Sequence, residues 1–162
     1  SAKKFDIPAL EAELIAAGDW ITSYRSSGTL YGTFFDAKAS FIVYPFFKPQ
    51  SFLKYGNMKL AASPDVAAMK IIAISQRGKK RDFIDLYWYC INREPLELVI
   101  KRALKQYPYV QHSVGHFLKS LIYFEDAEAD PMPKLFFEAD WPGIKSYFRR
   151  NVPRIARELL LK

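Results

Sequence analysis

The stretch from Ser63 to Tyr89 constrains the fold more than any other part of the chain, because it predicts two helices joined by a tight turn. Ser63 is a good N-cap residue, and Pro64 at the first helical position loses nothing by lacking an N–H. Gly78 stands where a left-handed residue would end the first helix, and a second helix is predicted from about Arg81. Apolar residues at helical spacing predict one buried face of the first helix, at Val66, Met69, Ile72 and Ala73.

The junction of the two predicted helices is dense in charge. Its charged residues are Asp65, Lys70, Arg77, Lys79, Lys80, Arg81, Asp82 and Asp85. One interpretation is a phosphate-binding edge, where a lysine on the first helix and basic residues of the turn face a polyanion such as a nucleoside triphosphate. The other is a solvated loop with ordinary intrahelical pairs, such as Arg81 with Asp85 four residues later. Charge alone leaves both interpretations open.

The same stretch resembles a known family. The pattern is carried by Asp65-Val66-Ala67-Ala68-Met69-Lys70, by Arg77-Gly78 and by Lys80-Arg81-Asp82-Phe83-Ile84-Asp85-Leu86-Tyr87. It is similar to the pattern of the AbiEii/AbiGii-type nucleotidyltransferase-like toxins, the toxin halves of bacterial abortive-infection toxin–antitoxin systems. Two further stretches resemble the family, Tyr123–Glu128 with the following Asp130–Pro133, and the extended segment Leu30–Pro45. The resemblance therefore runs from about Leu30 onward.

The resemblance implies a role for each charged residue of the junction. Asp82 and Asp85 would be the catalytic pair, acting as general base or orienting one. The nucleotide and its phosphates would be bound by Lys70, Arg77, Lys80 and Arg81. Asp65 would support the site by holding Lys70 or by capping its helix. The intact family enzyme would use Mg²⁺ to transfer a nucleotide from a nucleoside triphosphate to an RNA or protein hydroxyl, and an antitoxin protein would be a further partner.

One feature of the family pattern does not occur in this sequence. Nucleotidyltransferases of this kind open with a Gly-Gly-Thr or Gly-Ser turn, followed by an Asp-x-Asp strand that binds divalent metal. Gly28-Thr29 and Gly32-Thr33 lie in a predicted hairpin, and no Asp-x-Asp follows either. A third acidic ligand is usual on a later strand, where this chain has Ser40, a poor ligand for a hard cation. We therefore expect no metal site and no cofactor for this chain alone.

These observations favour a nucleotidyltransferase-like toxin that is truncated or degenerate and inactive as this chain. The alternative is a non-catalytic basic module that binds nucleotide, nucleic acid or an antitoxin protein. A third hypothesis is structural, in which the charged residues only hold two helices together.

The order of predicted elements favours an α+β fold, with antiparallel strands of a partial nucleotidyltransferase-like sheet followed by a helical C-terminal half. A helix is predicted over 6–17 with Leu10, Leu14 and Ile15 inward, then strands over 19–25, 29–36 and up to residue 44. Residues 45–55 are predicted to be irregular, with one short strand over 58–61. Helices follow over 94–106, 110–124 and 142–162, the last kinked or interrupted at Pro153. We expect an α+β region over 1–91 and a helical region over 92–162.

Composition narrows the setting. A net charge of +7 favours anionic partners, although a merely basic surface is the equal alternative. The single cysteine, Cys90, lies in an apolar helical run and is predicted to be a buried thiol. Without a long apolar run or a signal peptide, the protein is expected to be cytoplasmic, with no membrane partner. His112 and His116 have the spacing of metal ligands on a helix, but a surface or capping role is the stronger interpretation.

Overall fold

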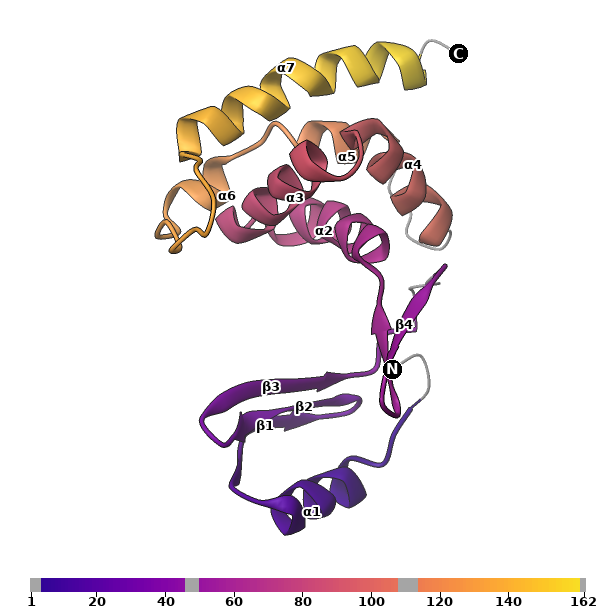
Figure 1. Cartoon of the computed structure of the whole chain (residues 1–162), viewed down its shortest axis with the longest axis vertical. Helices are drawn as coiled ribbons and strands as arrows, with labels where there is room; N and C mark the ends of the chain where they lie inside the picture. The colour runs from indigo at the N-terminus through magenta and orange to yellow at the C-terminus, as the bar shows by residue number, and fades with distance from the viewer. Residues whose placement is uncertain (1–3, 46–49, 108–113, 161–162) are drawn as a thin grey trace. The chain divides into compact units, whose positions relative to one another are not determined.

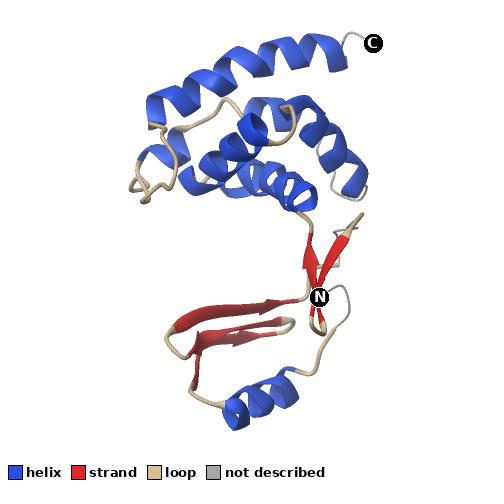
Figure 2. Ribbon diagram, in the orientation of Figure 1, coloured by secondary structure: helices blue, strands red, loops and turns tan. Residues whose placement is uncertain are grey.

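The computed structural model describes residues 4–45, 50–107 and 114–160, and the chain forms two compact units, Ser1–Lys48 and Pro49–Lys162. Five strands precede all but the first helix (Figure 2), which confirms the α+β class. The expected regions 1–91 and 92–162 stay a prediction. No helix within the described ranges is both long and apolar enough to cross a membrane.

The N-terminal unit is one helix and a three-stranded antiparallel sheet. Helix α1 (Ile7–Ala17) begins where the Asp6 side chain accepts a hydrogen bond from the Ala9 N–H. Strands β1 (Trp20–Ser26), β2 (Thr29–Phe34) and β3 (Ala37–Ile42) follow in the order β1-β2-β3 (Figure 1). The three predicted strands and the first helix are thus confirmed. The prediction that Ile15 faces inward is wrong, because its side chain is 59% exposed.

One two-residue turn and one close side-chain contact support the register of this sheet. Phe35 and Asp36 both adopt positive φ, the geometry of a two-residue hairpin turn whose twist matches the flanking strands. Trp20 and Leu30 are buried, and the Trp20 ring lies directly against Gly32 on the paired strand. A side chain at Gly32 would collide with the indole, so glycine is required there.

The C-terminal unit starts with a hairpin and continues as a helical bundle. Strands β4 (Phe52–Tyr55) and β5 (Met58–Ala61) pair antiparallel across a turn at Gly56. The short strand over 58–61 is confirmed, but the prediction of irregular structure over 52–55 is wrong. All four β4 side chains are exposed, so this strand lacks the apolar–polar alternation by which strands are predicted.

The helices of the bundle are α2 (Ser63–Arg77), α3 (Lys80–Asn92), α4 (Leu96–Gln106), α5 (Val114–Ser120), α6 (Glu125–Glu128) and α7 (Trp141–Leu160). Helix α2 packs on α3, α4 and α5, while α7 packs on α3 and α5. Phe83 lies at the centre, with its ring 5.1 Å from Phe124, 5.8 Å from Trp141 and 5.6 Å from Phe148. The buried face of α3 is therefore fixed by aromatic packing, and the opposite face is available for polar side chains.

Three of the helices differ from the prediction. Ala62, not Ser63, is the N-cap of α2, and its side chain cannot cap. The helix predicted over 110–124 is observed as α5 followed by a turn, with residues 108–113 outside the described ranges. Helix α7 continues through Pro153 without interruption. Val66 is also exposed, so the buried face of α2 is rotated toward Ala67, Ala68, Ile71 and Ile72.

Candidate functional site

The turn between α2 and α3 is held by backbone geometry. Gly78 adopts φ 55 and ψ 29, the left-handed conformation, and its N–H donates to the Ile74 carbonyl at 3.1 Å. Helix α3 starts two residues later, with Lys79 at the N-cap position. The predicted role of Gly78 is confirmed, and the tight turn brings the C-terminal half of α2 beside the start of α3.

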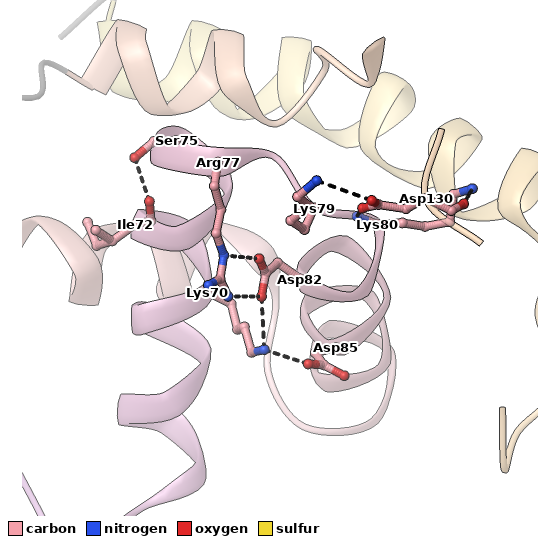
Figure 3. A network of polar contacts seen from close by, with 9 residues as sticks. All are labelled: Lys70, Ile72, Ser75, Arg77, Lys79, Lys80, Asp82, Asp85 and Asp130. Atoms are coloured by element: carbon pink, nitrogen blue, oxygen red, sulfur yellow. Dashed lines mark hydrogen bonds and ion pairs between the residues drawn. The ribbon is translucent and has the colours of Figure 1, made fainter. Parts of the chain in front are cut away.

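The carboxylate of Asp82 is the centre of a charged cluster at this turn (Figure 3). Arg77 donates to it from Nε at 2.9 Å and from Nη2 at 3.1 Å, and Lys70 donates from Nζ at 3.1 Å. Lys70 Nζ also lies 2.6 Å from Asp85 Oδ2. These four residues, Lys70, Arg77, Asp82 and Asp85, are called the charged cluster below. Asp82 is fully buried, whereas the Asp85 side chain is 54% exposed.

The electrostatics of the cluster distinguish its two carboxylates. Burial would raise the pKa of the Asp82 carboxyl, but hydrogen bonds from Arg77 and Lys70 outweigh burial and hold that pKa below its usual range. The hydrogen bond to Asp82 in turn raises the pKa of Arg77. Asp82 is therefore ionised near neutral pH and positions two cations. Asp85 is the carboxylate that a ligand can reach.

A cavity of about 920 Å³ lies beside the cluster, within the C-terminal unit. Its wall includes Lys70 of α2 and Arg81 and Asp85 of α3, but neither Arg77 nor Asp82. The family pattern also predicts one partly exposed cleft lined by Lys70 and Asp82, with Arg77 or Lys80. Lys70 lines the observed cavity, but Asp82 does not. The same prediction places this cleft beside the strand that bears Ser40. It involves both units, and it stays a prediction.

Lys80 points away from the charged cluster. Its Nζ donates to the main-chain carbonyls of Glu128 and Asp130, and it lies 5.3 Å from the centre of the Trp141 ring. Its backbone N–H donates to Asp130 Oδ2 at 2.9 Å, and Lys79 Nζ lies 3.2 Å from Asp130 Oδ1 (Figure 3). The acidic segment after α5 therefore holds the start of α3. Lys80 does not line the cavity described above.

Asp65 is also placed elsewhere than the resemblance implied. It is 1% exposed, and its Oδ2 accepts hydrogen bonds from the backbone N–H groups of Gln50, at 2.9 Å, and Ser51, at 3.2 Å. Its Oδ1 accepts a hydrogen bond from Gln106 at the end of α4. In the described contacts Asp65 does not touch Lys70. It ties the segment before β4 to α2 and α4.

The cluster does not suit a magnesium ion. The oxygens of Asp82 and Asp85 face the nitrogens of Lys70 and Arg77, and cations at those positions repel a further cation. Among the described residues, no three His, Cys, Asp or Glu side chains gather closely enough to hold a metal ion. His112 lies outside the described residues, so the proposed pair with His116 stays untested.

Sequence reasoning missed the apolar part of the cavity wall. Trp88 and Tyr89 of α3 line the cavity, together with Val66 of α2 and the loop over 133–137. Trp88 follows Arg81 by seven residues, which places both on one helical face, and this spacing was the signal available. Two smaller cavities, of about 330 Å³ and 360 Å³, lie near Tyr123 and near His116.

Two comparisons with known proteins found a match for this chain. The model of the family described as nucleotidyl transferase AbiEii toxin of type IV toxin–antitoxin systems matches residues 40–160. An uncharacterised protein of Aquifex aeolicus (strain VF5), aq_aa25, is 32% identical over 133 residues, which cover 80% of this chain. The chain spans 62% of that relative's length. No solved structure matches. The chain belongs to the AbiEii family of nucleotidyl transferase toxins.

Proposed function

We propose that this chain binds a nucleoside triphosphate and forms the phosphate-binding part of a nucleotidyltransferase toxin. Lys70 carries the proposal, because two carboxylates hold its ammonium group at the wall of a large cavity. An ammonium has three N–H donors, and the described contacts to Asp82 and Asp85 use two of them. The third would donate to a phosphate oxygen.

Arg81 supplies a second cation on the same wall. It is exposed, it lines the cavity beside Lys70 and Asp85, and its guanidinium suits bidentate binding of phosphate. Arg77 is engaged with Asp82 and does not line this cavity. The proposed phosphate ligands are therefore Lys70 and Arg81, with Arg77 acting through Asp82.

Nucleotidyl transfer joins an acceptor hydroxyl oxygen to the α-phosphorus, and pyrophosphate leaves. Asp85 is the proposed group near the acceptor hydroxyl, because it is half exposed at the cavity wall. The fixed negative charge of Asp82 suits it to positioning Lys70 instead. We also propose an RNA or protein acceptor and an antitoxin partner, both on the strength of family membership.

We expect this chain by itself to bind nucleotide without transferring it. Over residues 4–45, 50–107 and 114–160, the carboxylates offer no donor set for the Mg²⁺ that family enzymes use. This favours the binding alternative for the isolated chain, while the family favours the transferase for the protein as a whole.

Calorimetric titration with each of the four nucleoside triphosphates, with and without Mg²⁺, tests the proposal. Lys70→Ala should weaken binding at least about tenfold, because a charge-assisted hydrogen bond to phosphate is lost. Lys101→Ala is the matched control, since Lys101 pairs with Glu97 on α4 and does not line the cavity. Equal affinities for the two variants, or no binding at all, would contradict the proposal.

Transfer is measured separately with nucleoside triphosphates labelled at the α-phosphate and with RNA or protein as acceptor. We expect no label on either acceptor with this chain alone. Label that appears with the unaltered chain and disappears with Asp85→Asn would show that the chain is itself catalytic.

A further inference from the structure

The cavity beside the charged cluster is polar in one part and apolar in another. On α3 its wall is made by residues three, four, seven and eight positions after Arg81, namely Ile84, Asp85, Trp88 and Tyr89. With a rise of 1.5 Å per residue, Arg81 and Trp88 are about 10 Å apart along the helix. The cationic and aromatic groups therefore lie at different ends of one helical face.

Helix α2 repeats this division in the opposite direction. Its wall residues run from Ser63 and Val66 through Ala67 to Lys70. Because the tight Gly78 turn folds α3 back along α2, Lys70 comes near the start of α3 and meets Asp85. Val66 lies one helical turn earlier, on the side toward the later residues of α3. Both helices thus place charge at one end of the cavity and apolar side chains at the other.

Three apolar residues of the wall leave much hydrophobic surface in water. Val66 is 40% exposed, Trp88 is 38% exposed, and Phe136 in the loop over 133–137 is 95% exposed. The Arg93 guanidinium lies 6.0 Å from the centre of the Trp88 ring and covers one of its faces. Covering the remaining surface with a flat aromatic ligand would remove apolar area from water.

We infer that the Trp88 end of the cavity binds the nucleobase of the nucleotide, by stacking on the indole, while Lys70 and Arg81 hold the phosphates. This inference rests on the proposed function and adds the site of the base. The charged wall residues, the cations Lys70, Arg81 and Lys134 and the anion Asp85, sum to a net charge of +2. A ligand that is anionic at one end and aromatic at the other complements this wall. Stacking tolerates every base, so it selects nucleotides as a class.

Comparing the affinities for two ligands tests the two ends of the cavity separately. Each variant is titrated with a nucleoside triphosphate and with inorganic tripolyphosphate, which carries the phosphates without the base. Trp88→Ala should weaken nucleoside triphosphate binding about tenfold and leave tripolyphosphate binding unchanged. Trp88→Phe should restore most of the loss. Tyr55→Ala is the matched control, because Tyr55 is an exposed aromatic of the same unit that does not line the cavity.

The outcomes distinguish this inference from the proposed function. If Lys70→Ala and Arg81→Ala weaken both ligands while Trp88→Ala weakens neither, the phosphate site stands and the base site is wrong. If Trp88→Ala weakens both ligands equally, its effect is structural and the inference also fails. If the unaltered chain binds neither ligand, both proposals are overturned.

Discussion

Arg77 and Asp82 form two hydrogen bonds across the Gly78 turn, from Nε to Oδ2 at 2.9 Å and from Nη2 to Oδ1 at 3.1 Å. This pair ties the last residue of α2 to the first turn of α3. It accounts for part of the charge density of the turn, since these two opposite charges are fixed partners. It also orients the Asp82 carboxylate toward Lys70. The same carboxylate therefore binds Arg77, which holds the turn, and Lys70, the proposed phosphate ligand.

Asp82→Asn should destabilise the protein by about 2–3 kcal/mol. The substitution leaves Lys70 and Arg77 without their shared anion, and Asp82 is fully buried, although partial exposure of the two cations moderates the loss. Urea denaturation measures the change. Asp85→Asn is the matched control and should cost less than about 1 kcal/mol, because the Asp85 side chain is half exposed. An equal loss for both variants would show that Asp82 has no special structural role.

The lowered pKa of Asp82 predicts a stability that depends on acid. A carboxyl whose folded pKa lies below its unfolded value stabilises the fold fully above the unfolded value, about 3.9 for aspartate. That contribution is lost as pH falls through the folded pKa. The free energy of unfolding of Asp82→Asn, followed from pH 7 down to pH 2, should therefore decline less than that of the unaltered chain. Parallel curves would contradict the assignment.

Local signals made much of the fold predictable. The start of α1 at Asp6, the turn at Gly78 and the hairpins of the first sheet depend on residues a few positions apart, and the sequence displays those directly. The family pattern also singled out Lys70 and Asp82 as site residues, and their side chains meet at 3.1 Å. Strand β4 escaped prediction because its side chains are all exposed, and the α2 boundary moved by one residue because Ala62 takes the cap position without a side-chain bond.

Contacts between distant residues could not be predicted. Lys80 and Arg81 are adjacent and chemically similar, and only packing decides which one faces the cavity. Asp130, fifty positions later, accepts a hydrogen bond from the backbone N–H of Lys80, and the Trp141 ring lies against the Lys80 ammonium group. Likewise, the Asp65 carboxylate accepts a hydrogen bond from Gln106, which lies 41 positions later. Helical periodicity gives the face of a helix but not its neighbours.

Substitution of the two adjacent cations should therefore affect different properties, stability for Lys80 and nucleotide affinity for Arg81. Lys80→Ala should lower stability by about 1–3 kcal/mol and leave nucleotide affinity unchanged, because its nitrogen is buried against Glu128, Asp130 and Trp141. Arg81→Ala should leave the melting temperature nearly unchanged and weaken nucleotide binding. Thermal denaturation and calorimetric titration of both variants check this. Weaker nucleotide binding for Lys80→Ala at unchanged stability would contradict this prediction and would show that Lys80 binds phosphate.

Cys90 should be nearly inert in the folded protein. Burial raises the pKa of its thiol to about 12, although a hydrogen bond with Tyr147 acts in the opposite direction. At pH 8 this lowers the thiolate fraction on the order of a thousandfold relative to an unperturbed cysteine. Reaction with a disulfide reagent should thus be slow in buffer and fast in urea. A fast native reaction would place Cys90 at the surface, contrary to the sequence prediction and to its burial in the structure.

Asp65 should control the segment before β4 rather than the cavity. Asp65→Ala removes the acceptor of the Gln50 and Ser51 N–H groups and of the Gln106 side chain, so the loss of stability should be about 2 kcal/mol or more. Hydrogen exchange gives the local readout. The amides of Gln50 and Ser51 should exchange faster by a larger factor than those of α7, since they lose a direct partner as well as global stability. An equal increase in both places would mean that Asp65 acts only through global stability, and an unchanged rate at Gln50 would contradict the observed hydrogen bond.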